Sequence, residues 1–253
     1  MTFYTHGTSQ IFYEATGHGE PVILLPGFSE RSTDHAALLT LLAAHYRVVA
    51  VDLPGSGRSL PQPRSYSVTY YQEDAEALSA LIRSQTDGPV HLIGFSDGGE
   101  VALLIAALDP DLVRSVLVWG AAGAAPASSG PLLDALETLF DDPVSLVASW
   151  GPHLVDRYGE PTARAMIQSF VAALRAIVAA GGDISRGMAG KIACPLLLIA
   201  GEDDIFVTRA MADDFAFAAR NARAIEVLGA GHDVHNARPD WFAHTVQEWL
   251  ASN

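Results

Sequence analysis

The stretch "VHLIGFSDGGEVALLIAAL", from Val90 to Leu108, joins two apolar runs through a glycine-rich turn. The first run is short and aliphatic, which is typical of a strand covered on both faces of a parallel sheet. The second run has the length and composition of a helix. Between them, Gly94, Ser96 and Gly98 form a Gly-x-Ser-x-Gly pattern. A bare Gly/Ser turn is often only structural, but the strand before it and the helix after it favour an exposed, nucleophilic serine.

Further runs of both kinds alternate along the chain. Strands are expected at "IFYEA" from Ile11, "PVILLP" from Pro21, "RVVAVDL" from Arg47, "VHLIGF" from Val90, "VRSVLVWG" from Val113, "PLLLIAG" from Pro195 and "RAIEVL" from Arg223. Helices are expected after Asp34, after Ser67, after Asp97 and at "PDWFAHTVQEWL" near the C-terminus. This alternation predicts an α/β fold with a mostly parallel central sheet and right-handed crossovers.

The alternation stops between Ala121 and Lys191. A linker rich in glycine, alanine, proline and serine opens this region, and helical periodicity without a strand follows it. We expect a helical lid at residues 122–191, inserted into a core made of residues 1–121 and 192–253. Two ordinary crossover helices are the alternative, but such a connection needs far fewer residues.

Composition limits the possible partners and compartments. The chain has 253 residues, 49% of them hydrophobic, and a formal net charge of -14, which would repel nucleic acids and anionic membranes. Cys194 is the single cysteine, so no internal disulfide can form. We find neither a signal-like N-terminus nor a stretch near the roughly twenty apolar residues of a membrane span. A cytoplasmic protein is expected, and its oligomeric state, monomer or homodimer, is left open.

A serine nucleophile requires a base that accepts its proton. Among nine histidines, His232 in "LGAGHDVHNARPDWF" follows a late strand, lies in a glycine-rich loop and precedes the last helix. His235 is the close alternative. A metal site at this pair is disfavoured because zinc needs three or four convergent ligands, so no metal is expected.

The acid that orients the base should follow the preceding strand, in "LLLIAGEDDIFVT". Glu202, Asp203 and Asp204 compete there, and a solvated acidic loop is the structural alternative. We favour Asp204, three residues after the strand-ending glycine, and keep Asp203 as the second choice.

Two backbone N–H groups should hold the developing oxyanion. We expect them at Asp97, directly after the serine, and at Phe28 in "VILLPGFSE". The alternative for the second segment is a plain β-turn, which uses the same residue types.

Taken together, these segments resemble the serine α/β-hydrolases over nearly the whole chain. "LLPGF", "VDLPGSGRS", "GFSDGG", "VLVWGA", "CPLLLIAGEDD" and "GHDVHNARPDWF" occur in the family's order. "GFSDGG", "YYQEDAEAL" and "VWGA" are most similar to the valacyclovirase (biphenyl-hydrolase-like) branch. The resemblance implies an α/β-hydrolase fold and an esterase of small esters, including α-amino-acid esters, with Ser96, Asp204 and His232 as triad and no cofactor. Many relatives have a proline where this chain has Thr208.

The same resemblance does not decide between related activities. Lactone, thioester or carbon–carbon hydrolysis and perhydrolysis use the same triad. A ligand-binding protein of this fold with little turnover is the alternative from another class.

Asp97 is the residue that could narrow the substrate. In the first turn of a helix, a carboxylate is stabilised by about 0.3 to 1 kcal/mol through the unpaired N–H groups and the helix dipole. Next to an oxyanion it would be unfavourable, by up to roughly 4 kcal/mol at about 4 Å. A substrate ammonium would offset that repulsion, as the resemblance to the valacyclovirase branch implies. Helix capping and ammonium binding both stay open.

Aromatic side chains supply candidates for an apolar substrate pocket between sheet and lid. They are Phe28, Phe95, Trp119, Phe140, Trp150, Phe170 and Phe206. Ordinary core packing is the alternative for each. Trp119 is best placed, because it ends a strand at its carboxyl edge, and Trp150 is expected on the inner side of the lid.

Overall fold

A computed structural model describes residues 2–142, 144 and 147–253. The strands in this part are β1 (Thr2–His6), β2 (Ser9–Thr16), β3 (Pro21–Leu25), β4 (Arg47–Val51), β5 (Val90–Phe95), β6 (Val113–Trp119), β7 (Leu196–Gly201) and β8 (Ala222–Val227). They form one sheet in the order β1-β2-β4-β3-β5-β6-β7-β8. The pairs β1/β2 and β2/β4 are antiparallel and the other pairs are parallel, which confirms the predicted mostly parallel sheet.

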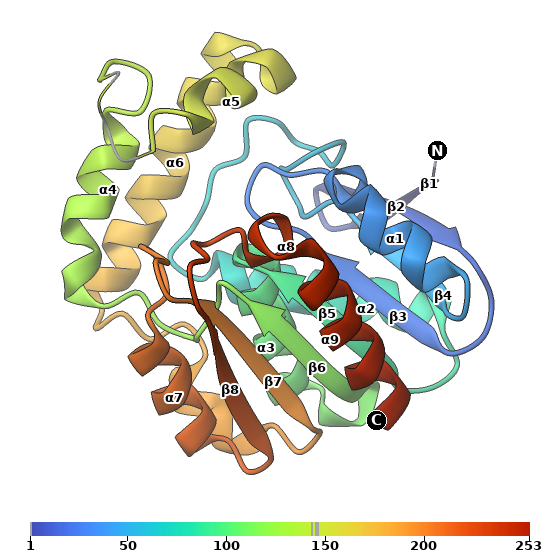
Figure 1. Ribbon diagram of the computed structural model, residues 1–253. Helices are drawn as coiled ribbons and strands as arrows, with labels where there is room; N and C mark the ends of the chain where they lie inside the picture. The colour runs from blue at the N-terminus through green and yellow to red at the C-terminus, as the bar shows by residue number, and fades with distance from the viewer. Residues whose placement is uncertain (1, 143, 145–146) are drawn as a thin grey trace.

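Helices cover both faces of the sheet (Figure 1). They are α1 (Ala36–Ala43), α2 (Tyr70–Gln85), α3 (Asp97–Leu108), α4 (Gly130–Glu137), α5 (Trp150–Tyr158), α6 (Glu160–Ala179), α7 (Arg209–Ala218), α8 (Val234–Ala237) and α9 (Pro239–Ser252). Short 3₁₀ helices are η1 (Ser32–His35), η2 (Pro110–Leu112), η3 (Ala127–Ser129) and η4 (Arg186–Lys191). One buried cluster joins the sheet to α1 and α9, and a larger one joins it to α2, α3 and α7 and extends to α4, α5 and α6.

The predicted lid region lies between β6 and β7, and it includes residues 143 and 145–146, which are outside the described part. Its helices α4, α5 and α6 stand apart from the sheet (Figure 1). The segments that enter and leave this region are hydrogen-bonded to each other. The Ala125 N–H donates to the Gly182 carbonyl at 2.8 Å, and the Ile184 N–H donates to the Gly123 carbonyl at 2.9 Å. At its C-terminal end, η4 packs against α3 and α7. The division into core and lid stays a prediction.

One helix differs from the expectation that no stretch approaches the length and apolar character of a membrane span. Helix α6 has 20 residues and reaches a mean hydropathy of 1.3, so it is long and apolar enough to cross a bilayer by length and composition. Single polar residues such as Arg175 interrupt the helix, so that its sequence contains no uninterrupted apolar run of this length. A packed helix of a globular protein can have the same profile, and α6 buries Met166, Ile167 and Phe170 in the larger cluster.

Candidate active site

Ser96 occupies the turn between β5 and α3 with a φ of 50°. Glycines on either side of it make this turn possible. A Cβ on Gly94 would lie 2.5 Å from the Gly98 carbonyl oxygen, and one on Gly98 would lie 2.2 Å from the Leu25 carbonyl oxygen. The Ser96 N–H donates to the Trp119 carbonyl at 2.9 Å and joins the turn to the end of β6. The turn therefore needs small residues because two backbone segments meet there.

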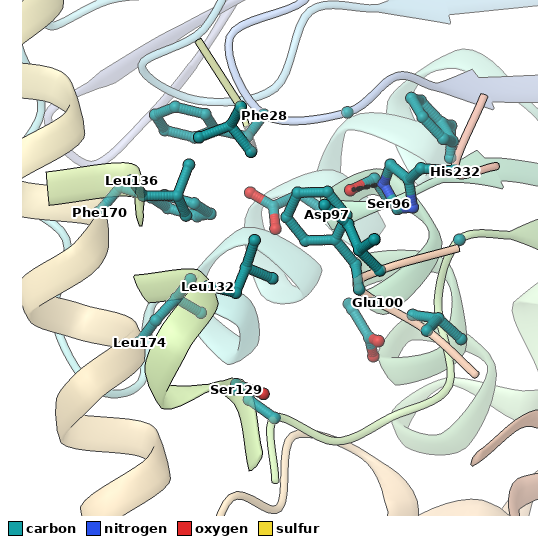
Figure 2. A pocket seen from close by; sticks show the side chains of 18 of the residues that line it. Phe28, Ser96, Asp97, Glu100, Ser129, Leu132, Leu136, Phe170, Leu174 and His232 are labelled. Atoms are coloured by element: carbon teal, nitrogen blue, oxygen red, sulfur yellow. Dashed lines mark hydrogen bonds between the residues drawn. The ribbon is translucent and has the colours of Figure 1, made fainter. Parts of the chain in front are cut away.

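The structure brings Ser96, His232 and Asp204 together. The Oγ of Ser96 lies 3.0 Å from Nε2 of His232, and Figure 2 shows the two side chains side by side. Nδ1 of the same ring lies 2.9 Å from Oδ2 of Asp204. His232 comes from the loop between β8 and α8, and Asp204 follows β7. With Nδ1–H bonded to the carboxylate, Nε2 is the ring atom available to accept the serine proton.

Asp204 is fixed by its own loop as well as by the imidazole. Its Oδ1 accepts the backbone N–H groups of Phe206 at 2.8 Å and Val207 at 3.1 Å, and its side chain is fully buried. Two neighbouring residues of this loop have other surroundings and roles than Asp204. Asp203 is exposed to solvent, and Thr208, in the place of the expected proline, caps α7 by accepting the Met211 N–H at 3.3 Å.

His235, the alternative base, lies elsewhere. Its Nδ1 accepts the indole N–H of Trp119 at 3.0 Å, and its ring centroid lies 4.9 Å from that of His35. Burial, with the neighbouring histidine, lowers the pKa of His235 to about 4. It is therefore a neutral, half-buried acceptor whose ring bonds to Trp119, whereas the serine hydroxyl bonds to His232.

Trp119 corrects one of our pocket predictions. Its side chain is 0% exposed and packs on Phe242 of α9 at 4.7 Å, on the sheet face away from α4, α5 and α6. Successive side chains of a strand point to opposite faces, and it is Gly120, one residue later, that borders the cavity. The sequence showed that this tryptophan ends a strand, but it did not show to which face its ring points.

A cavity of about 550 Å³ opens above Ser96. Polar residues Ser96, Asp97 and Glu100 line one side, and helices α4 and α6 line the other with apolar residues (Figure 2). Of the aromatic candidates, the lining includes Phe28, Phe95, Trp150, Phe170 and Phe206, and it does not include Phe140. The cavity is therefore amphipathic, with an acidic wall beside the serine.

Asp97 lies in this wall and is hydrogen-bonded by tyrosines of α2. The Tyr71 hydroxyl donates to its Oδ1 at 2.5 Å and the Tyr70 hydroxyl at 3.4 Å. Burial raises the pKa of the Asp97 carboxyl to about 7, against the opposite effect of the Tyr71 hydrogen bond. The tyrosine pair was missed because nothing local in "YYQEDAEAL" relates it to a residue 26 positions away.

Glu100 is a second carboxyl of the cavity that sequence reasoning missed. It accepts the backbone N–H groups of Ala122 at 2.9 Å and Gly123 at 3.0 Å, where the chain leaves β6 for the helical region. Burial raises the pKa of this carboxyl to about 8. Its spacing was a usable signal, because a residue four positions after Ser96 lies on the same side of the α3 helix.

The loop after β3 presents Phe28 beside the nucleophile turn. Gly27 donates its N–H to Oε2 of Glu30 at 2.8 Å, and its carbonyl accepts the Glu30 N–H at 3.2 Å. The carbonyl of Gly27 and the N–H of Phe28 belong to one trans peptide unit and point to opposite sides. The Phe28 N–H is therefore directed away from Glu30. Glu30 was not among the predicted site residues.

In the ranges that the structure describes, no group of three or more histidine, cysteine, aspartate or glutamate side chains is arranged to hold a metal ion. His232 and His235, considered above as a metal pair, instead hydrogen-bond to Ser96 and Trp119 respectively.

Comparison with known proteins agrees with this architecture. The model of the "Alpha/beta hydrolase family" matches residues 22–245. Serine hydrolase BPHL of Homo sapiens is 27% identical, with 95% of this chain and 83% of that protein covered. The pimeloyl-[acyl-carrier protein] methyl ester esterase of Chromobacterium violaceum is 28% identical, with 91% and 86% covered. The enol-lactonase structure from Burkholderia xenovorans has a TM-score of 0.76 at 22% identity, covering 99% of this chain and 100% of that one. The chain belongs to the α/β hydrolase family and is a hydrolase with that fold.

Proposed function

We propose that this hydrolase cleaves small carboxylic esters through an acyl-enzyme at Ser96. One observation carries the proposal: a single imidazole, that of His232, lies 3.0 Å from the serine Oγ and 2.9 Å from a buried carboxylate. Serine is a weak nucleophile without such a base, and the base needs a partner that fixes its tautomer.

In the proposed acylation step, Ser96 Oγ attacks the ester carbonyl carbon while His232 Nε2 takes the hydroxyl proton. The Phe28 and Asp97 N–H groups bind the oxyanion that forms. The C–O bond to the leaving group then breaks, and His232 returns the proton to the departing alkoxide oxygen. Asp204 stays ionised and stabilises the imidazolium.

Deacylation repeats these roles with water as the nucleophile. His232 accepts a proton from the water, whose oxygen attacks the acyl carbonyl, and returns it to Ser96 Oγ as the acid product leaves. The apolar walls contributed by α4 and α6 would limit the access of other water to the acyl group.

For the substrate we propose an acyl group that carries an α-amino group, recognised by Asp97. The carboxyl lines the cavity directly beside the serine. A carboxylate there opposes the oxyanion, and burial raises its pKa to about 7, so that it is partly neutral at neutral pH. A substrate ammonium would favour the ionised form and offset its charge next to the oxyanion.

A panel of p-nitrophenyl esters with short acyl chains tests the ester proposal. We expect turnover by the wild type, loss of turnover in Ser96→Ala, and labelling of Ser96 by a fluorophosphonate probe, located by mass spectrometry. A folded wild type that neither turns over the panel nor reacts at Ser96 would instead favour a ligand-binding protein.

A matched pair of aryl esters tests the amino-group proposal. L-Alanine and propanoate esters differ only by the amino group, and we expect the wild type to prefer the first by about tenfold in kcat/KM. Asp97→Asn should remove most of that preference while it leaves propanoate turnover within about threefold. Equal preference in both proteins would refute the role of Asp97.

A further inference from the structure

The backbone of Ser29, next to Phe28, has a conformation that the surrounding residues must hold. Its φ is 65°, in the left-handed region that residues other than glycine seldom adopt. Its N–H donates to Ser56 Oγ at 2.9 Å. Its carbonyl accepts two hydrogen bonds, from the Tyr158 hydroxyl at 2.6 Å and from Nη1 of Arg157 at 2.9 Å. A strained backbone conformation persists where several contacts hold it. Of the three hydrogen bonds to the Ser29 backbone, two come from residues of α5.

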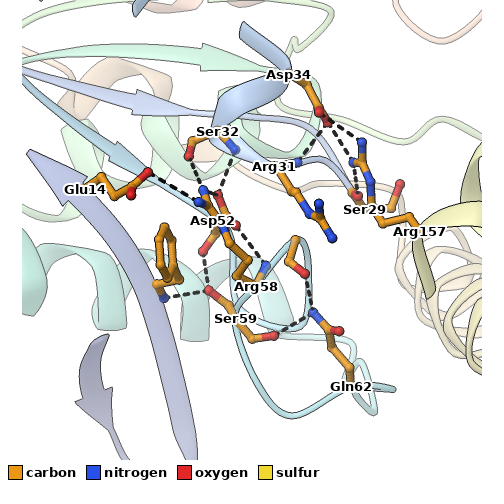
Figure 3. A network of polar contacts seen from close by, with 12 residues as sticks. Glu14, Ser29, Arg31, Ser32, Asp34, Asp52, Arg58, Ser59, Gln62 and Arg157 are labelled. Atoms are coloured by element: carbon orange, nitrogen blue, oxygen red, sulfur yellow. Dashed lines mark hydrogen bonds and ion pairs between the residues drawn. The ribbon is translucent and has the colours of Figure 1, made fainter. Parts of the chain in front are cut away.

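Tyr158 joins this carbonyl to a second loop of the core. Its hydroxyl also accepts the Gly57 N–H at 2.7 Å, so one oxygen connects the loop after β3 with the loop after β4. Arg157 reinforces the contact through paired bonds to Asp34 at 2.7 and 2.9 Å (Figure 3). Removal of the Tyr158 hydroxyl would leave the Gly57 N–H without this acceptor and the Ser29 carbonyl with the Arg157 bond alone.

Helices α5 and α6 also hold the ring of Phe28. The ring stacks on that of Phe170 with centroids 3.9 Å apart and planes 17° apart, and it meets Trp150 edge-on at 5.8 Å. The residue that presents the proposed oxyanion donor is thus held through its ring, and the next residue through its carbonyl, by the same two helices.

The far end of this loop is anchored in the core instead. The Ser32 N–H donates to the buried carboxylate of Asp52 at 2.7 Å, and the Arg58 side chain donates to the same carboxylate, also at 2.7 Å (Figure 3). Upstream, the Leu25 end of β3 belongs to the sheet. Residues 28–29 are therefore held mainly by α5 and α6, with one bond to the core at Ser56.

We propose that Tyr158, assisted by Arg157, is a positioning residue that sets the Phe28 N–H in the oxyanion hole. Its hydroxyl fixes the Ser29 carbonyl, and the Phe28–Ser29 backbone turns with it. The inference rests on the proposed function in that it assigns the Phe28 N–H to the oxyanion. The helical region would then complete the reaction site as well as cover it.

The test compares Tyr158→Phe with Arg164→Ala. Arg164 lies on α6 and pairs with Asp141 and Glu160 at 2.9 Å, so its loss disturbs the same region away from Phe28. We would measure kcat and KM for p-nitrophenyl butyrate, normalised to the sites titrated by a fluorophosphonate. We would also measure by calorimetry the affinity for phenylboronic acid, which forms a tetrahedral anionic adduct with a reactive serine.

We expect Tyr158→Phe to lower kcat by roughly 10- to 100-fold with KM within about twofold, because a displaced oxyanion donor affects the transition state alone. The affinity for phenylboronic acid should fall by a similar factor. A general loss of structure would reduce the number of titrated sites and leave both normalised quantities unchanged. Arg164→Ala should leave both unchanged as well.

Unchanged normalised kcat and boronate affinity in Tyr158→Phe would overturn the inference and leave the proposed function intact. A wild type without ester turnover, whose boronate affinity still falls in Tyr158→Phe, would refute the proposed function and support the inference. If Tyr158→Phe does not fold by circular dichroism, Arg157→Gln replaces it, with an expected loss of about 3- to 10-fold in both quantities and unchanged values again overturning the inference.

Discussion

The two sides of Ser96 are built by different parts of the molecule. On one side, His232 and Asp204 come from loops after β8 and β7, and their hydrogen bonds join these loops to the turn after β5. On the other side, Phe28 and the cavity wall depend on α4, α5 and α6 as well. The proposed proton relay therefore depends on the sheet, whereas the proposed oxyanion loop and the shape of the cavity depend on both regions. Changes in the helices should alter selectivity and transition-state binding more than proton transfer.

The largest effect is expected on the sheet side, at the nucleophile. Ser96→Ala should reduce kcat by about 10⁶-fold, because removal of the nucleophile abolishes the acyl-enzyme route. Thermal unfolding should change little, since only one hydroxyl is lost. Steady-state assays with the p-nitrophenyl ester panel measure this, and a variant within tenfold of the wild type would contradict the proposed mechanism.

Asp204→Asn tests which carboxylate of the loop after β7 orients His232. The amide would no longer select the tautomer of His232 with Nε2 free, so kcat should fall by about 10⁴-fold. Asp203→Asn is the matched control, because this neighbour is exposed and should stay within about twofold of the wild type. A larger loss in Asp203→Asn than in Asp204→Asn would mean that we have assigned the wrong acid.

Gly120→Ala tests how closely the sheet holds the base. Gly120 has a φ of 65°, and a Cβ there would lie 2.6 Å from Cε1 of His232. We expect a displaced imidazole and a fall in kcat of about 100-fold, together with a loss of about 1 to 2 kcal/mol of unfolding free energy from the left-handed backbone. The control is Gly130→Ala in α4, where an added Cβ meets nothing within 4 Å. Steady-state assays of both variants measure the change in kcat, and chemical denaturation measures the change in unfolding free energy.

A pH profile tests the charge of Asp97, which lies in the cavity beside Ser96. We would compare p-nitrophenyl esters of glycine betaine, a permanent cation, and of its neutral isostere 3,3-dimethylbutanoic acid. Both require His232, so its protonation cancels in the ratio of their kcat/KM values, and the ratio reports the charge of the cavity carboxyls Asp97 and Glu100. Because the folded-state pKa is raised to about 7 and the ionised form attracts the cation, the ratio should rise about tenfold from about pH 6 to 8. In Asp97→Asn the rise should be much smaller, and the part that remains reports Glu100, whose pKa burial raises to about 8.

The smallest effect concerns the tyrosine that bonds Asp97. Tyr71→Phe removes a hydrogen bond that lowers the pKa of Asp97, so the rise in the ratio should move to higher pH. At neutral pH the preference for the cationic ester should fall by about threefold, because the roughly 1 kcal/mol of one hydrogen bond raises the pKa by about 0.7 unit and lowers the ionised fraction by that factor. Tyr13→Phe, on strand β2, is the control. A rise that moves to lower pH in Tyr71→Phe would contradict this role.

Local sequence patterns were sufficient to predict most strands of the sheet. Strands β3 to β7 are apolar and largely buried, so their composition marks them without tertiary information. Strand β1 was not expected, because an edge strand with mostly exposed side chains has no continuous apolar run. Helix α7 was also not predicted, although Thr208 caps its start.

In the candidate site too, the sequence predicted some features, and the structure was needed for others. Ser96, His232 and Asp204 follow strand ends in a fixed chain order, and a parallel sheet places such ends at one edge. Trp119 met the same criterion, and its ring nonetheless packs against α9. Chain order places the backbone of a residue near the site, whereas the direction of its side chain depends on strand twist and packing.

The sequence by itself determined most strands of the sheet, the turn at Ser96 and the candidate triad, because each is encoded by residues close together in the chain or by the order of strands. Only the tertiary structure decided what surrounds them. The bond from Tyr71 to Asp97 and that from Tyr158 to Ser29 join residues 26 and 129 positions apart. No local pattern encodes such contacts, because they form only when helices pack together in three dimensions.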